Sequence, residues 1–196
     1  MRASTRREFI AGPAGRIECA VDSPGSSRGI ALIAHPHPLF GGTLDNKVVQ
    51  TLARAFVELG YETWRPNFRG VGATEGVHDE GRGELEDLEL VLRKIGTEKF
   101  VLAGFSFGAS LVARLAEKVR PEWLVLVGVG VTRLMAPPVA EGTLVIHGEN
   151  DDTVPLAAVL DWARPQELPV VLVPGADHFF HRKLHVLKRI VQANWK

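Results

Sequence analysis

Residues 100–110 read FVLAGFSFGAS, and this stretch decides the fold. Its first part, Phe100–Gly104, is an apolar run typical of a buried strand, and Ala109–Val119 after it predicts a helix. The motif G-x-S-x-G lies between them, with Ser106 at its centre. Small residues two positions before and after a serine let a strand turn sharply into a helix, and such a turn exposes the hydroxyl. We interpret Ser106 as a nucleophile; the alternative is a glycine–serine turn without reactivity.

The rest of the chain alternates strands with helices. Expected strands are Glu8–Ile10, Arg16–Val21, Ile30–Ala34, Glu62–Asn67, Phe100–Gly104, Trp123–Val129, Thr143–His147 and Val170–Val173. Expected helices are Asp45–Leu59, Gly83–Ile95, Ala109–Val119, Leu156–Ala163 and His181–Asn194. Three strands from Ile30 onward are continuous apolar runs, as expected when helices cover both faces of a parallel sheet. The first two strands have no helix between them and should form an antiparallel edge. We therefore predict an α/β fold with a mostly parallel, doubly wound sheet of about eight strands, in a single domain spanning residues 1–196.

Ligands of such sheets bind at the carboxyl ends of the strands, and two further candidate residues follow strands there. The strand Thr143–His147 leads into the turn HGENDDTVP, which offers Asp151 and Asp152 as acids. The last strand leads into PGADHFF, which offers His178. A serine, an acid and a histidine in this chain order match a triad in which the histidine takes the serine proton and the acid orients the histidine. The second acid of such a pair often caps a helix or faces solvent, which is the simpler interpretation of Asp152.

Together these motifs resemble the α/β-hydrolase superfamily, and the similarity covers essentially the whole chain. Further stretches resemble a group of small bacterial hydrolases close to dienelactone hydrolases and esterases: HPHPL at 35–39, GGT at 41–43, NKVV at 46–49, NFRGVG at 67–72 and HFFHRKL at 178–184. The family pattern H-G-x-x-D-x-x-V-P selects Asp151 over Asp152. Dienelactone hydrolases proper use a cysteine where this chain has Ser106, so their substrate is not transferred.

The resemblance and the proline positions together predict an oxyanion hole. The first donor should be the backbone N–H of Phe107, which follows the nucleophile. The second should come from the loop after Ile30–Ala34, where Pro36 and Pro38 have no N–H, so His37 or Leu39 remains. The family pattern H-G-x-P favours His37. We expect Leu39, Phe40 and Phe179 to form an apolar substrate pocket.

Composition excludes several classes of protein. The 196 residues carry 23 basic and 23 acidic side chains, so the chain lacks the surplus of positive charge that nucleic-acid binding requires. The single cysteine, Cys19, excludes an internal disulfide and a four-cysteine zinc site. No apolar run approaches the ~20 residues that span a bilayer, and no signal peptide is evident. We expect a cytoplasmic protein, monomeric or homodimeric.

The expected function follows from these residues. The interval Gly130–Gly142 has only 13 residues, too few for a cap domain, so the site should be open. The histidines 35 and 37 have no carboxylate or third histidine placed locally, and no H-E-x-x-H pattern accompanies the histidines 181 and 185, so no metal is expected. The glycines of Gly70–Gly76 have the wrong spacing for a dinucleotide fingerprint. We expect a cofactor-independent serine hydrolase that cleaves small carboxylic esters through an acyl-enzyme. The alternatives are a thioesterase, an amidase or aminopeptidase with the same triad, and a non-catalytic binding protein of this fold.

Overall fold

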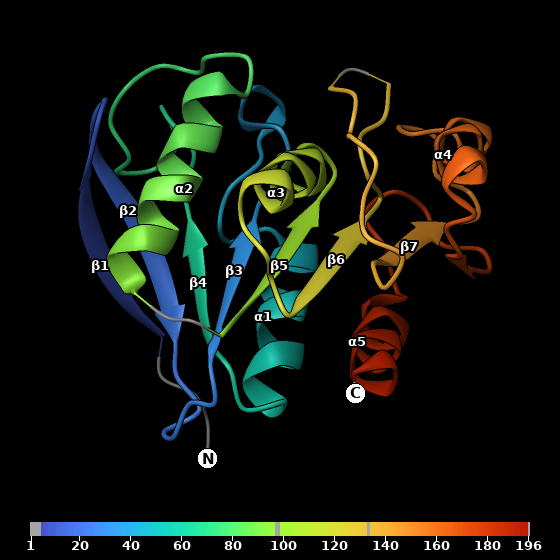
Figure 1. The fold of residues 1–196 in the computed structure, drawn as a ribbon, viewed down its shortest axis with the longest axis horizontal. Helices are drawn as coiled ribbons and strands as arrows, with labels where there is room; N and C mark the ends of the chain where they lie inside the picture. Colours follow the sequence, from blue (N-terminus) through green and yellow to red (C-terminus); the bar gives the residue numbers. More distant parts are fainter. Residues whose placement is uncertain (1–4, 97–98, 133, 196) are drawn as a thin grey trace.

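The computed structural model describes residues 5–96, 99–132 and 134–195. Eight strands form one sheet in the order β1-β2-β4-β3-β5-β6-β7-β8 (Figure 1). The strands are β1 (Thr5–Gly12), β2 (Gly15–Asp22), β3 (Ile30–Ala34), β4 (Glu62–Pro66), β5 (Phe100–Phe105), β6 (Trp123–Val127), β7 (Leu144–Gly148) and β8 (Val170–Val173). β1 pairs antiparallel with β2, and β2 with β4, whereas every other pairing is parallel. This confirms the predicted mostly parallel sheet with an antiparallel edge.

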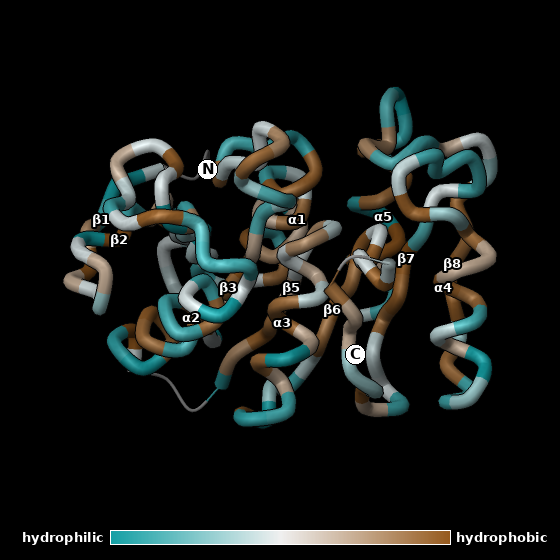
Figure 2. Tube along the Cα trace, turned by 90° about the horizontal axis from the view of Figure 1, so that it is seen from above, coloured by the Kyte–Doolittle hydropathy of each residue, from teal (hydrophilic) through white to brown (hydrophobic). Residues whose placement is uncertain are grey.

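Helices cover both faces of the sheet. The helices are α1 (Lys47–Glu58), α2 (Arg82–Ile95), α3 (Phe107–Lys118), α4 (Leu156–Ala163) and α5 (Leu184–Asn194), with short 3-10 helices at Pro38–Phe40 and Arg164–Gln166. α1 and α5 share one apolar core with one face of the sheet, and α2, α3 and α4 share the other. Figure 2 shows α1 and α5 on the opposite side of the strands from α2 and α3. Because both faces are covered, the strands β3, β5 and β6 are apolar along their whole length.

Several predicted ends are displaced for local reasons. The helix expected at His181–Asn194 begins only at Leu184, because Asp177 accepts hydrogen bonds from the N–H groups of Phe180 and His181 and closes a turn. The strand expected to reach Val129 ends at Val127, since Gly128 has a φ of 52°. α1 begins at Lys47, not Asp45, because the Asn46 side chain caps it.

The segment between β6 and β7 contains no helix in the part that the structure describes, residues 128–132 and 134–143. The molecule therefore has no lid over the carboxyl ends of these strands, as predicted. Among the described residues, no helix combines the length and apolar character needed to cross a membrane.

Candidate active site

Ser106 lies in the turn between β5 and α3. Its backbone angles, a φ of 56° and a ψ of −117°, lie outside the regions that residues with a side chain ordinarily adopt. A methyl group on Gly104 would lie 2.5 Å from the backbone of Gly108, and one on Gly108 would collide with the carbonyl oxygens of Ala34 and His35. The two glycines of the motif are therefore required because backbone passes directly beside them. The turn leaves Ser106 at the carboxyl edge of the sheet.

The structure brings the three predicted residues Ser106, His178 and Asp151 into one hydrogen-bonded chain. His178 Nε2 lies 3.1 Å from Ser106 Oγ, and His178 Nδ1 lies 2.7 Å from Asp151 Oδ2. His178 and Asp151 are both buried. Since an ionised carboxylate only accepts hydrogen bonds, Nδ1 carries the proton and Nε2 is left to accept the serine hydrogen.

The structure distinguishes the two candidate acids. The second carboxylate oxygen of Asp151 accepts hydrogen bonds from the backbone N–H groups of Thr153, at 3.0 Å, and Val154, at 2.7 Å. Burial alone would raise the pKa of Asp151, but the hydrogen bonds from His178 and Val154 outweigh it and lower the pKa. Asp152 is exposed and accepts a hydrogen bond only from Thr153 Oγ1 among the described residues. Asp151 is thus an ionised, fixed partner of His178.

Backbone contacts hold the loops of Asp151 and His178 together. The N–H of Asn150 donates to Ala176 O at 2.8 Å, and the N–H of Glu149 donates to Val173 O at 3.1 Å. On its inner side the His178 ring packs on Phe105, with ring centroids 4.8 Å apart. A methyl group on Gly128 would lie 3.3 Å from His178 Cε1, so a glycine there leaves room for the ring. Phe105 of β5 and Asp151, in the loop after β7, therefore position His178.

Two buried contacts hold the loop after β3. The buried His35 Nδ1 lies 2.7 Å from Pro36 O, while His35 Nε2 accepts the N–H of Phe68 at 2.9 Å. Burial lowers the pKa of His35 to about 3, against the raising effect of the Pro36 carbonyl, so the ring is neutral. This histidine ties the loop of the expected oxyanion hole to the segment after β4.

The structure separates the candidates on this loop. The N–H of Leu39 donates to His37 Nδ1 at 3.3 Å, inside the 3-10 helix. Leu39 is 66% exposed and is not among the residues that line the cavity beside Ser106, in contrast to its expected place in the pocket. The 3-10 turn is the reason, because it directs Leu39 outward while Phe40 and His37 face the cavity.

A cavity of about 340 Å³ opens beside Ser106. Apolar parts of its wall come from Phe40, Phe107, Leu134, Val154 and Phe179. Phe40 and Phe179, both predicted for the pocket, remain 68% and 43% exposed. The cavity thus combines a nucleophile with an apolar wall open to solvent, which is the usual character of a small-molecule site.

Sequence reasoning missed two residues that contact the site. His147 is buried on β7, with its Nε2 3.0 Å from Val154 O and 3.6 Å from Asp151 Oδ2. Asn46 lines the same cavity as Ser106. The signals were present, since His147 opens the turn that holds Asp151 and Asn46 precedes an amphipathic helix. No group of three or more potential metal ligands occurs among the described residues.

Comparisons with known proteins agree with this fold. Residues 37–141, more than half of the chain, match the family model of the alpha/beta hydrolase fold. An uncharacterized protein of Rickettsia prowazekii (strain Madrid E) is 31% identical over 207 residues, which cover 93% of this chain and 85% of the relative. An alpha-beta serine hydrolase homologue from Coxiella burnetii superimposes with a TM-score of 0.91 at 39% identity, covering 97% of both chains. An α/β serine hydrolase without lid from Xanthomonas campestris superimposes with a TM-score of 0.88 at 35% identity, covering 99% of this chain and 94% of the other.

Proposed function

This chain belongs to the α/β-hydrolase fold family, and from that premise we propose that it cleaves small carboxylic esters with Ser106, His178 and Asp151 as its catalytic triad. The observation that carries the proposal is the chain of hydrogen bonds from Asp151 through His178 to Ser106, at 2.7 and 3.1 Å, beside an open cavity. Serine is a weak nucleophile on its own, and a base at hydrogen-bond distance activates it.

The proposed reaction begins with proton transfer. His178 Nε2 takes the proton of Ser106 as Oγ attacks the ester carbonyl carbon, and the carbonyl oxygen becomes an anion. When the C–O bond of the tetrahedral intermediate breaks, the imidazolium returns the proton to the leaving alcohol and the acyl group stays on Oγ. Water then attacks the acyl-enzyme by the same route, which releases the acid and restores the serine.

The oxyanion would be held by backbone N–H groups. Phe107 is the first residue of α3, so its N–H has no acceptor within its own helix. For the second donor, His37 is favoured over Leu39, because His37 lines the cavity and Leu39 is not among its lining residues. Loss of one such donor typically costs about 2.7–4 kcal/mol of transition-state stabilisation.

The lining of the cavity favours uncharged substrates. Its phenylalanine and aliphatic wall would bury an apolar acyl or alcohol group, and its volume of about 340 Å³ suits a small one. Ester, thioester and amide substrates of one acyl group, compared by kcat/KM, measure the reaction subclass directly. We expect the ester to be the best substrate.

The experiment compares Ser106→Ala, Asp151→Asn and Asp152→Asn with the unchanged protein. We expect Ser106→Ala to abolish fluorophosphonate labelling and turnover of p-nitrophenyl butyrate. Asp151→Asn should lower kcat by about 10⁴-fold, since it favours the wrong histidine tautomer. Asp152→Asn is the matched control and should stay within about threefold, because surface substitutions are close to neutral. Labelling that persists in Ser106→Ala, or equal losses from the two aspartate variants, would overturn the assignment.

A further inference from the structure

Asn46 lines the cavity, and its amide nitrogen is a hydrogen-bond donor that the proposed reaction does not use. We propose that Asn46 determines substrate specificity by donating a hydrogen bond from Nδ2 to an uncharged oxygen of the ester outside the scissile group. The inference rests on the proposed function. It narrows the substrate class to esters whose acyl or alcohol part carries an ether, hydroxyl or keto oxygen.

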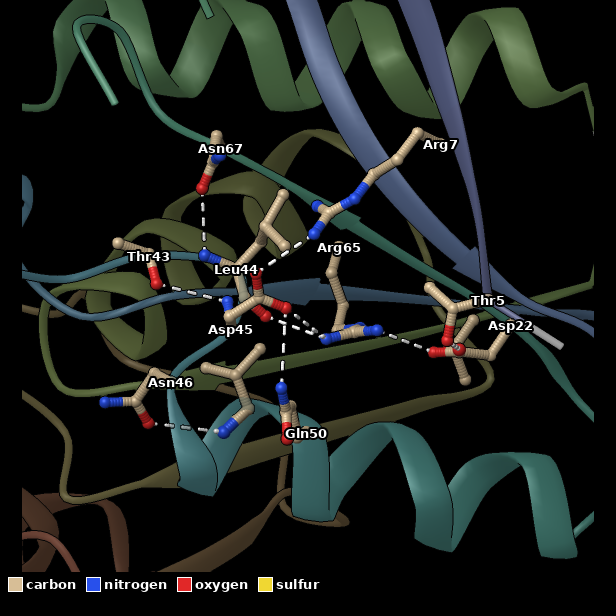
Figure 3. Close-up of polar contacts among 12 residues, drawn as sticks. Thr5, Arg7, Asp22, Thr43, Leu44, Asp45, Asn46, Gln50, Arg65 and Asn67 are labelled. Atoms are coloured by element: carbon tan, nitrogen blue, oxygen red, sulfur yellow. Dashed lines mark hydrogen bonds and ion pairs between the residues drawn. The ribbon is translucent and has the colours of Figure 1, made fainter. Parts of the chain in front are cut away.

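The orientation of the Asn46 amide is fixed by helix α1. Its Oδ1 accepts the backbone N–H of Val48 at 2.9 Å and that of Val49 at 3.4 Å. Because both partners are donors, only the oxygen end of the amide can face them, and the nitrogen end must point away. Figure 3 shows the oxygen directed at the helix and the nitrogen on the opposite side.

The Nδ2 group has no protein acceptor among the residues that the structure describes. Asn46 is partly buried and lines the cavity that contains Ser106. An amide nitrogen with two hydrogens in such a position donates either to water or to a ligand. A bound substrate that displaces the water loses affinity unless it supplies an acceptor in its place.

The segment before Asn46 is braced by buried polar contacts (Figure 3). The Arg65 guanidinium, 4% exposed, donates to Leu44 O at 2.8 Å and to Asp22 Oδ2 at 2.8 Å. Asn67 Oδ1 accepts the N–H of Leu44 at 2.9 Å. The donor on Asn46 is therefore held in place before substrate binds, so little ordering entropy opposes its use.

The required ligand group is an oxygen and not a cation. Nδ2 only donates, so an ammonium group gains nothing there, and the nearby apolar wall of Phe40 and Phe107 disfavours a fully charged group. A neutral oxygen on an otherwise apolar chain can accept a hydrogen bond from Nδ2 while the rest of the chain packs on the apolar wall.

The test uses p-nitrophenyl hexanoate and three analogues with an ether oxygen in place of the methylene at carbon 3, 4 or 5. Hexyl acetate and its corresponding ether alcohol esters probe the alcohol side. Each ratio of kcat/KM, ether over alkyl, is divided by the same ratio for hydroxide-catalysed hydrolysis to remove intrinsic reactivity. We expect a normalised ratio of about three to ten for at least one analogue, the usual gain from one hydrogen bond.

The variants separate the donor from the helix cap. Asn46→Asp keeps a capping oxygen but replaces the donor with an acceptor, so Tm should hold while the ratio falls to one or below. In Asn46→Ala the normalised ratio should fall to about one, and Tm should fall because the helix cap is lost. Asn194→Asp, a surface change on α5 that makes the same substitution, should keep the ratio.

The results distinguish a failure of the proposed role of Asn46 from a failure of the proposed function. A ratio near one for every analogue, or a high ratio that persists in Asn46→Asp, overturns the role of Asn46 while Ser106-dependent hydrolysis of the alkyl esters still supports the proposed function. If no ester is hydrolysed in a Ser106-dependent way, the proposed function fails and the inference fails with it.

Discussion

Single residues of the candidate site adopt costly conformations. Ser106 has a φ of 56°, and Phe180 and Arg182, which follow His178, have φ values of 54° and 60°. A non-glycine residue in this region costs of order 1–3 kcal/mol and persists only where surrounding contacts determine it. Phe180 is fully buried, which supplies such contacts. Three of the five described non-glycine residues with a positive φ thus lie in the Ser106 turn or in the loop after His178, and the other two are Glu80 and Glu167.

Buried neutral histidines make stability depend on pH. Burial lowers the pKa of His35 to about 3, and it lowers the pKa of His147 as well. Below the unfolded value of about 6.5 the unfolded chain binds protons that the folded chain excludes, so the free energy of unfolding falls as pH falls. From pH 6 to 5 we expect His35 to contribute a loss of about 1 kcal/mol per pH unit.

Urea denaturation at pH 7, 6 and 5 measures this dependence. His35→Asn removes the titrating group, so its stability should decline less steeply with acid than that of the unchanged protein, whatever its absolute stability. A variant with an unchanged slope would show that His35 is not the group responsible.

At the scale of elements, the close approach of α3 to β3 positions the loop of the oxyanion hole. The first turn of α3 passes so near the end of β3 that a methyl group on Gly108 would lie 2.4 Å from the carbonyl oxygens of Ala34 and His35. Gly108→Ala would ordinarily favour a helix by about 0.5–1 kcal/mol. Here the methyl group would push the His35–Pro36 segment away from Ser106.

We therefore expect Gly108→Ala to destabilise the protein by about 1–3 kcal/mol and to lower kcat at least tenfold, measured by urea denaturation and ester turnover. Gly142→Ala is the control, because nothing lies within 4 Å of the added methyl group. Its stability should change by less than about 0.5 kcal/mol. Equal stability and kcat in the two variants would contradict this account of the turn.

The ends of some helices and strands could be predicted from the sequence, and those of others could not. The strands Ile30–Ala34 and Val170–Val173 and the helix Leu156–Ala163 were predicted with their observed ends, because apolar runs and a proline mark them. The start of α5 was not, since a side-chain turn at Asp177 replaces the first helical turn there. The order of the strands depends on pairings between distant segments, which local patterns do not encode.

The residues of the candidate site likewise fall into those that the sequence could locate and those that it could not. Ser106, Asp151 and His178 could be located because each follows a strand in a motif with fixed spacing. Leu39 and Phe40 are adjacent in the chain but face different surroundings, and only the geometry of the 3-10 turn separates them. Asn46 was missed because a sequence can indicate that a residue caps a helix, but it does not show where the Nδ2 group of that residue points.

At the scale of the whole molecule, the cavity is open because nothing helical lies between β6 and β7 in the described residues 128–132 and 134–143. We expect no interfacial activation. The rate with p-nitrophenyl butyrate should follow one hyperbola through the solubility limit of the ester, measured in a stirred assay. A severalfold rise when droplets form would contradict an open site.

The connectivity of the sheet also sets the order in which a growing chain acquires chemistry. Ser106 and His178 are separated by 72 positions, and His178 follows β8, which is made after the other seven strands of the described sheet. During synthesis the ribosome therefore produces the serine turn well before its base. Under the proposed triad, we expect a nascent chain that holds β5 and α3 alone to carry an unactivated hydroxyl, and hydrolysis to begin only once β8 has paired with β7. We therefore expect the serine to stay inactive during synthesis until the sheet is assembled.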